Sequence, residues 1–409
     1  MKTIYSLFLA VFITQIATAQ TWNKQVSGTK SKLWNVYFLN NDTGFVCGKE
    51  AILKTTNGGA NWNTLSFDDT DEFEVIQFVN SNIGYVSGAN GTLLKTINGG
   101  NNWTNTSPNI SDSAGGGIWF TNADTGLYAI GTKLYSNSRI LKTRNGGVSW
   151  DTVYKGSGWI SYFFFTDANH GWATASDSKI LKTIDGGDNW TVQNVAGGWM
   201  SGIYFFNKDT GFVSGGICIS YPDSAVGSTW ETTDGGAIWN QVLDINSSGA
   251  KIFFANYDIG YSLWADCTGL GILMKTINGG SNWIKDSTVE GNLRGLYFTG
   301  TNNGYAVGDD GVILKYGIAT SIKNLGPGKV NIAVYPNPTN HSATLKFENP
   351  TKEKCILTFY NTQGRLVLTI TNITTNTVEI ERRNLTSGPY FFQLCGSKQI
   401  IATGKLTIE

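Results

Sequence analysis

The stretch Thr55-Thr56-Asn57-Gly58-Gly59-Ala60-Asn61-Trp62 decides the fold of this chain, because it returns in related form five more times along the sequence. Each copy ends in a tryptophan, and neighbouring copies lie 40 to 49 residues apart. Units of that length, built from several short apolar strands, are typical of the blades of a β-propeller. The six tryptophans are Trp62, Trp103, Trp150, Trp190, Trp239 and Trp283.

The other parts of each unit give the number of blades. A first apolar strand is followed by a polar turn and then by a glycine paired with an aromatic residue or leucine, and this pair occurs seven times. A third strand of the Ile-Leu-Lys-Thr type leads into the tryptophan turn and a fourth strand. The seventh unit stops at Gly317 without that turn, whereas residues 21–26 resemble the missing fourth strand. We therefore expect an all-β fold with a seven-bladed propeller over residues 20–317, whose N-terminal strand completes the last blade and removes an open sheet edge.

The repeated turn has a mechanical interpretation. Its Asn or Asp side chain is expected to accept a backbone N–H bond two residues further on, and its glycines supply positive φ angles. The tryptophan then packs back under the hairpin. Because Asn and Asp both serve at the same position, a negative charge is not required. A structural role is therefore predicted for Asn57, Asn98, Asn145, Asp185, Asp234 and Asn278.

These turns are identified as Asp-box, or BNR, repeats, and the units over residues 21–317 resemble the propellers of photosystem II assembly and stability factors. The resemblance to sialidases and xyloglucanase-type glycosidases is looser. In the assembly factors, arginines on the inner strands contribute to partner binding. One arginine stands at the seven matching positions, so the resemblance implies the fold rather than the photosynthetic role. These positions are Trp34, Glu74, Gly116, Ser161, Ser201, Ala250 and Arg294.

The N-terminal residues 1–19 have the features of a secretory signal peptide. Lys2 precedes an apolar stretch over 4–16, and Ala17-Thr18-Ala19 forms a small-residue cleavage site. No other run approaches the length of a membrane span. The chain has 30 basic and 30 acidic residues, a balance that argues against a nucleic-acid partner. No spacing of metal ligands and no cofactor motif is found, so neither a metal nor a cofactor is predicted.

Residues 318–329 are interpreted as a linker, and residues 330–409 as a small β-sandwich. Four motifs in this last part resemble the type A C-terminal sorting domain of the type IX secretion system. The resemblance implies a source in the Bacteroidota, export across the outer membrane, and recognition of residues 330–409 by the secretion machinery and its sortase. It also implies possible removal of the domain and attachment to the cell surface. The motifs are Val334-Tyr335-Pro336-Asn337-Pro338-Thr339, Tyr360-Asn361-Thr362-Gln363-Gly364-Arg365-Leu366-Val367, Leu385-Thr386-Ser387-Gly388-Pro389-Tyr390 and Gly404-Lys405-Leu406.

The propeller face opposite the box turns carries the insertions, and loops on a rigid scaffold are where binding sites are usually built. Candidate ligand-binding residues there are Tyr135, Arg139, Tyr221, Trp264, Trp159, Trp199 and Arg294. The structural alternative is that these rings only pack between blades. Two cysteine pairs are possible disulfides in an oxidising compartment, Cys218 with Cys267 and Cys355 with Cys395. Cys47 is expected to be a small buried residue.

Three functions remain open. The first is a secreted or surface-attached, non-catalytic binding or adhesion propeller. The second is a glycoside hydrolase that uses carboxylates of the insertion face, for which Asp68, Asp69, Asp71 and Glu72 are candidates. The third is an assembly factor of the periplasm or outer membrane. Sialidase chemistry is disfavoured, because a sialidase needs three arginines to hold the carboxylate of its substrate. The propeller has three arginines, and one of them, Arg144, lies in a box turn on the opposite face, so no triad can form.

Overall fold

The structure is a computed structural model that describes residues 20–65, 72–110, 113–132, 137–195, 198–220, 224–318, 332–349, 352–361, 366–383, 385–396 and 400–409. The predicted signal peptide and most of the predicted linker lie outside the described residues. Contacts divide the chain into two compact units, with the division between Thr320 and Ser321.

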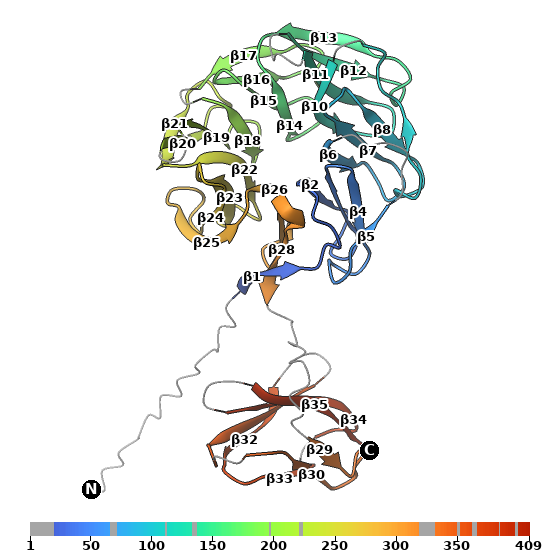
Figure 1. Cartoon of the computed structure of the whole chain (residues 1–409), viewed down its shortest axis with the longest axis vertical. Coiled ribbons are helices and arrows are strands. Elements are labelled where there is room, and N and C mark those ends of the chain that lie inside the picture. Colours follow the sequence, from blue (N-terminus) through green and yellow to red (C-terminus); the bar gives the residue numbers. More distant parts are fainter. Residues whose placement is uncertain are drawn as a thin grey trace, which may run out of the picture. The chain divides into compact units, whose positions relative to one another are not determined.

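The first unit is a propeller of seven four-stranded antiparallel sheets, as the sequence predicts (Figure 1). In each blade the first strand lies innermost. The blades are, in chain order, β2 (Leu33–Phe38), β3 (Gly44–Gly48), β4 (Ala51–Thr55) and β5 (Asn63–Thr64); β6 (Phe73–Phe78), β7 (Gly84–Gly88), β8 (Leu93–Thr96) and β9 (Thr104–Asn105); β10 (Ser113–Phe120), β11 (Gly126–Thr132), β12 (Ser138–Thr143) and β13 (Asp151–Gly156); β14 (Ile160–Phe165), β15 (Gly171–Ala175), β16 (Lys179–Thr183) and β17 (Thr191–Asn194); β18 (Met200–Phe205), β19 (Gly211–Ser220), β20 (Ser224–Thr232) and β21 (Asn240–Ile245); β22 (Ser248–Phe254), β23 (Gly260–Ala265), β24 (Leu270–Thr276) and β25 (Ile284–Glu290); and β26 (Leu293–Gly300), β27 (Asn303–Gly308), β28 (Ile313–Ile318) and β1 (Gln20–Gln25). A short 3-10 helix, η1 (Asp309–Gly311), joins β27 to β28.

The N-terminal strand closes the ring, which confirms the closure hypothesis. β1 pairs antiparallel with β28, and Trp22 lies opposite Tyr316. The Trp22 ring meets Phe298 edge-on with the ring centres 5.9 Å apart, the same contact that each box tryptophan makes with the phenylalanine of its own blade. Trp22 thus replaces the tryptophan that the seventh blade lacks.

Neighbouring blades are joined by stacked aromatic rings. The phenylalanine that ends each first strand lies against the glycine of its own second strand, where an added Cβ would overlap the ring. On its other side, the aromatic residue after the preceding blade's glycine packs against it at six of the seven junctions. Five of these ring pairs are stacked, and the rings of Phe212 and Phe254 are tilted by 31°. The glycine–aromatic pairs of the sequence therefore hold neighbouring blades together. The ring pairs are Phe45–Phe78, Tyr85–Phe120, Trp172–Phe205, Phe212–Phe254, Tyr261–Phe298 and Tyr305–Phe38.

The lysine of the Ile-Leu-Lys-Thr strand adds a polar connection between blades. In five blades its ammonium group donates to the carbonyl oxygen of the first box glycine in the next blade, and in four of these, all except that of Lys142, it also lies over the aromatic ring of its own blade. Lys275 donates to the Tyr316 hydroxyl instead. In the last blade Lys315 donates to Gly58 of the first blade over 2.7 Å, so this pattern also runs through the closure. The bonds are Lys54 to Gly99, Lys95 to Gly146, Lys142 to Gly186, Lys182 to Gly235 and Lys315 to Gly58.

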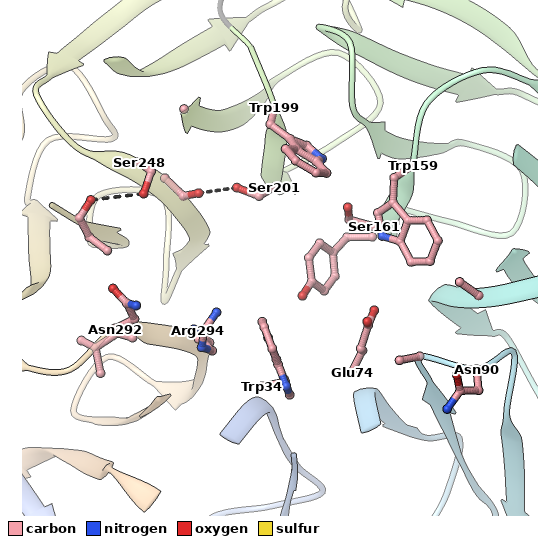
Figure 2. A pocket seen from close by; sticks show the side chains of 17 residues that line it. Trp34, Glu74, Asn90, Trp159, Ser161, Trp199, Ser201, Ser248, Asn292 and Arg294 are labelled. Carbon is pink, nitrogen blue, oxygen red and sulfur yellow. Dashed lines mark hydrogen bonds between the residues drawn. The ribbon is translucent and has the colours of Figure 1, made fainter. Parts of the chain in front are cut away.

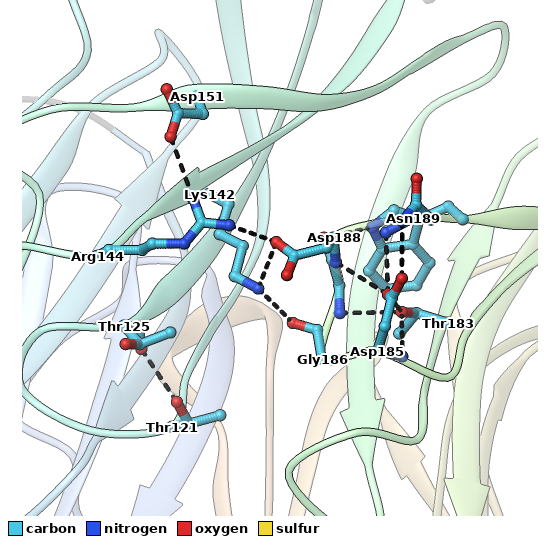
Figure 3. A network of polar contacts seen from close by, with 12 residues as sticks. Thr121, Thr125, Lys142, Arg144, Asp151, Thr183, Asp185, Gly186, Asp188 and Asn189 are labelled. Atoms are coloured by element: carbon cyan, nitrogen blue, oxygen red, sulfur yellow. Dashed lines mark hydrogen bonds and ion pairs between the residues drawn. The ribbon is translucent and has the colours of Figure 1, made fainter.

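All six box turns have the same internal hydrogen bonds. The threonine hydroxyl donates to the Asn or Asp side chain, and that side chain accepts the backbone N–H of the residue four positions further on, such as Asn61 for Asn57. The sequence predicts that the side chain accepts the N–H two residues further on. The N–H four residues further on takes that place, because the glycines between them have positive φ angles and turn the chain back. In Figure 3, Arg144 and Lys142 of one blade both reach Asp188 in the next box turn.

The second unit is a β-sandwich, as predicted. One sheet contains β29 (Ala333–Tyr335), β30 (Ser342–Lys346) and β33 (Thr377–Glu381), and the other contains β32 (Leu366–Ile373), β31 (Cys355–Tyr360), β34 (Gly388–Cys395) and β35 (Ile400–Ile408). Alternate residues of both sheets form a single apolar core that includes Leu345, Leu357 and Leu394.

The cysteines separate into one bonded pair and three free thiols. A disulfide joins Cys218 of β19 to Cys267, with the Cα atoms 5.7 Å apart, and so links the fifth and sixth blades. The predicted pair Cys355 and Cys395 is wrong, since both are free. Cys355 faces the sandwich core, whereas Cys395 lies opposite the exposed Ile356 on the other face of the sheet. Cys47 is buried, as expected.

Replacing Trp22 by Ala should lower the free energy of unfolding by about 3 kcal/mol, because the ring that fills the closing blade is lost. Thermal unfolding of the purified protein measures this effect. Val26→Ala is the control, since Val26 follows the same strand and is 84% exposed. Equal melting temperatures for the two variants would contradict the closure.

Asp185→Ala should destabilise the fourth blade by about 1 to 2 kcal/mol, because the N–H of Asn189 loses its acceptor. Asp185→Asn keeps that acceptor and should cost less than about 0.5 kcal/mol. Denaturant unfolding of both variants checks the difference. A large loss for the Asn variant would show that the box needs a charge and would refute the structural role.

Candidate functional site

The first strands of the seven blades surround a central channel. Along each strand, alternate side chains face the channel, and two cavities open between them. The outer cavity, here called the channel mouth, has a volume of about 770 Å³. It lies at the ends where the fourth-to-first and second-to-third connections run, on the face opposite the box turns. Its described lining residues are Trp34, Glu74, Ala89, Asn90, Ala114, Trp159, Ser161, Tyr162, Trp199, Ser201, Gly216, Ser248, Gly249, Ala265, Asn292, Leu293 and Arg294.

Two tryptophans reach the channel mouth from the connections that precede β14 and β18. Trp159 and Trp199 each follow a glycine with a φ near +90°, Gly158 and Gly198, and this conformation turns the chain toward the channel. The backbone of Trp159 is fixed by Ser176, whose hydroxyl accepts its N–H over 2.7 Å. Trp199 keeps 38% of its surface exposed. Figure 2 shows both rings on one side of the cavity, across from Trp34 and Arg294.

The opposite wall is a connected polar and aromatic group. Arg294 makes two hydrogen bonds to the carboxylate of Asp309, over 2.7 and 3.0 Å, and its guanidinium lies 4.0 Å from the centre of the Trp34 ring. The Trp34 indole N–H donates to Glu72 over 2.8 Å. Burial by itself would raise the pKa of Asp309, but the hydrogen bonds and charge of Arg294 outweigh it and lower the pKa. The charge of Arg294 is therefore neutralised within the protein.

Below the channel mouth, Tyr162 and Lys251 separate it from the inner cavity of about 360 Å³. The Lys251 ammonium lies over the Tyr162 ring. Burial lowers the pKa of Lys251 well below its usual value, against the opposing influence of Cys47 and Glu74. The inner cavity is walled by large rings, one from each of six first strands, namely Tyr37, Trp119, Phe164, Tyr204, Phe253 and Tyr297.

The structure brings together three of the predicted binding residues and separates others. Trp159, Trp199 and Arg294 line the channel mouth. Trp264 does not, because its ring is fully buried against Gly227 and Gly249 and its N–H donates to Ser262. Its prediction as a ligand-binding residue is corrected, since the ring fills the space that these glycines leave. Arg139 is exposed on β12 and lies away from the cavity lining.

Several candidate site residues from the sequence lie outside the described residues. They are Tyr135, Tyr221 and the acidic residues 68–71. The sequence reasoning also missed Trp34, Glu74, Asn90 and Asn292 as site residues. Trp34 and Glu74 could have been identified from the sequence, because both stand at the second position of a first strand.

Within the described ranges no three His, Cys, Asp or Glu side chains cluster as metal ligands would. No described helix has the length and apolar character needed to cross a membrane.

Comparison with known proteins agrees with this architecture. Residues 14–156 match the family model described as photosynthesis system II assembly factor YCF48, and residues 333–409 match that of the secretion system C-terminal sorting domain. The photosystem II stability/assembly factor HCF136 of Oryza sativa subsp. japonica is 41% identical over 70 residues, which are 15% of this chain and 17% of that protein. The Arabidopsis thaliana factor is 34% identical over 77 residues, 18% of this chain and 19% of that protein. The chain thus spans less than a fifth of the length of either relative.

Solved structures show the same fold. YCF48 from Cyanidioschyzon merolae superposes with a TM-score of 0.58 at 19% identity, covering 73% of this chain and 98% of that one. YCF48 bound to D1 peptide gives 0.58 at 16% identity, covering 72% and 96%. A GH74 xyloglucanase from Xanthomonas campestris gives 0.54 at 11% identity, covering 81% and 60%. At these identities the likeness shows the fold alone.

Fold and tail together define an exported β-propeller protein with Asp-box blades. In particular, the chain carries a YCF48-like BNR domain followed by a C-terminal sorting domain of the type IX secretion system. The sorting domain indicates secretion or attachment to the cell surface.

Asp309→Asn tests the wall of the channel mouth. The folded pKa of Asp309 lies below its unfolded value of about 3.9, so its carboxylate stabilises the fold above that pH. This stabilisation is lost as the pH falls through the folded pKa. The variant should therefore be less stable than the natural protein by about 1 to 2 kcal/mol near neutral pH, with the gap shrinking in acid.

Unfolding curves recorded at several pH values measure the gap. Asp310→Asn is the matched control, because Asp310 is the exposed neighbour and an asparagine tolerates its positive φ. A gap that does not depend on pH would contradict the pairing of Asp309 with Arg294.

Proposed function

We propose that this protein is an exported, non-catalytic binding or adhesion protein, and that its ligand occupies the channel mouth. The observation that carries the proposal is the convergence of three indole rings, those of Trp34, Trp159 and Trp199, on one cavity that also has polar side chains in its lining. The volume of about 770 Å³ lies within the range of ligand sites.

The chemistry of the wall supports binding. Indole rings offer flat apolar faces to a ligand, and neighbouring polar groups fix its orientation. Ser161, Ser201, Ser248, Asn90 and Asn292 supply such groups around the rings. The loops that hold Trp159 and Trp199 are anchored on β14 and β18, so the site needs little ordering before a ligand binds.

The relatives contribute two ligand classes to the proposal. One solved YCF48 structure holds D1 peptide, and the similar enzyme from Xanthomonas campestris is a xyloglucanase, whose substrate is a glycan. In this chain one of the seven inner-strand positions is an arginine, and Arg294 is already paired with Asp309. The assembly-factor role in the periplasm or outer membrane therefore remains the second alternative.

A glycoside hydrolase is the first alternative. Such enzymes use two carboxyl groups on either side of the scissile bond. Among the described residues that line the channel mouth, Glu74 is the one with a carboxyl group. Glu72, a candidate from the sequence, accepts the Trp34 indole N–H instead. Binding without turnover is the function that this lining supports best.

Export places the site outside the cell. We infer that residues 330–409 engage the type IX secretion machinery and its sortase, and that residues 20–317 then act at the surface or in the medium.

The proposal predicts that Trp159→Ala and Trp199→Ala each weaken ligand binding at least about tenfold, since each ring removed costs more than about 1.4 kcal/mol. The purified chain is applied to glycan and peptide arrays, and the retained probes are measured by titration. Tyr257→Ala is the control, because Tyr257 is an exposed ring in a first-to-second-strand loop on the opposite face.

The other outcomes distinguish the alternatives. Release of product from a glycan, abolished by Glu74→Gln, would favour the hydrolase. Co-purification of a membrane protein that is unaffected by either tryptophan variant would favour the assembly factor. Retention of every probe by both tryptophan variants would contradict the proposed site.

A further inference from the structure

The positive charge of the channel mouth is paired inside the protein. Among its described lining residues, Arg294 and Glu74 carry formal charge. Arg294 is held by Asp309 through two hydrogen bonds, so it supports Trp34 rather than presenting a cation to the cavity. Glu74 adds a single carboxyl group to this lining.

The remaining polar groups of the wall are uncharged. The Ser201 hydroxyl donates to the Gly249 carbonyl oxygen, and the Ser248 hydroxyl donates to the Ala265 carbonyl oxygen. Each hydroxyl oxygen keeps lone pairs that can accept a hydrogen bond. The Asn292 amide donates one N–H to the Asp309 carboxylate over 3.2 Å, and a side-chain amide such as that of Asn292 or Asn90 carries both donor and acceptor groups. Such a set matches a ligand whose groups both donate and accept, as hydroxyl groups do.

The three rings occupy two sides of the wall. Trp159 and Trp199 come from the adjacent fourth and fifth blades, and Trp34 comes from the first blade on the other side of the cavity (Figure 2). Small residues of the lining, Ala89, Ala114, Gly216, Gly249 and Ala265, leave the wall open. A ligand that touches Trp159 and Trp199 must therefore extend along one side of the mouth, and it must cross the mouth to reach Trp34.

From these features we propose that the ligand is an uncharged oligosaccharide that lies in the channel mouth, with sugar rings stacked on Trp159 and Trp199 along one side. The inference rests on the proposed function and narrows it to one ligand class. An anionic glycan would need an unpaired arginine or lysine, and a cationic peptide would need more than the single Glu74 carboxylate. A neutral polyhydroxylated chain uses the stacking faces, the serine oxygens and the two amides together.

The test compares neutral gluco-, manno- and xylo-oligosaccharides of increasing length with uronate-containing and sialylated glycans and with neutral, acidic and basic peptides. The full chain is used. We expect a neutral oligosaccharide to bind best, with affinity rising at least about tenfold from one sugar unit to four, because a second ring gains its own stacking platform. Raising the salt concentration from about 0.05 to 0.5 M should change the affinity less than about twofold, since no charge pair is formed with the ligand.

Variants separate this inference from the proposed function. Trp159→Ala and Trp199→Ala should each cost at least about tenfold, whereas Glu74→Gln should cost less than about threefold because it keeps a hydrogen-bonding group. Preferred binding of an acidic glycan, or of a peptide with strong dependence on salt and Glu74, would overturn the neutral-glycan inference while leaving the site in place. Probes that bind equally to the natural protein and to both tryptophan variants would overturn the site itself.

Discussion

The structure depends on one contact repeated at six of the seven blade junctions, the packing of an aromatic residue from one blade against the phenylalanine of the next. That phenylalanine lies directly on a glycine of its own second strand, so any larger residue there would displace it. Because the contact also joins Tyr305 to Phe38, the last blade is tied to the first by the same interaction that joins the others. With the closing strand β1 paired to β28, the first strands are held at fixed positions around the channel.

A rigid ring of first strands explains how a site can be built from distant parts of the chain. Trp34 and Arg294 lie far apart in sequence, yet they meet because their blades are neighbours across the closure. The glycines before Trp159 and Trp199 then direct the two rings to the same opening. Toward the box face, six large rings wall the inner cavity, whereas Ser161, Ser248 and Asn292 line the mouth.

The fold could be predicted from the sequence because its signals are local and repeated. The box turn, the glycine–aromatic pair and the Ile-Leu-Lys-Thr strand each report a contact within one blade or with its neighbour. The site was harder to predict, because its residues are defined by radial position rather than by a motif. Trp159 and Trp199 could be selected from the loops that carry them, whereas the prediction for Trp264 was wrong. The sequence shows an aromatic residue near an insertion, but it does not show that Gly227 and Gly249 pack against this ring and leave the room that buries it. The Cys355 and Cys395 pairing failed for a related reason, since strand register decides which face each side chain takes.

The most direct test of the account is an experimental structure of the full chain with a bound neutral oligosaccharide. The account predicts sugar rings packed on the indoles of Trp159 and Trp199, with hydroxyl groups near Ser201 and Asn292 and the Arg294–Asp309 pair intact. A ligand bound on the Asp-box face or on the C-terminal sandwich, with the channel mouth empty, would contradict it.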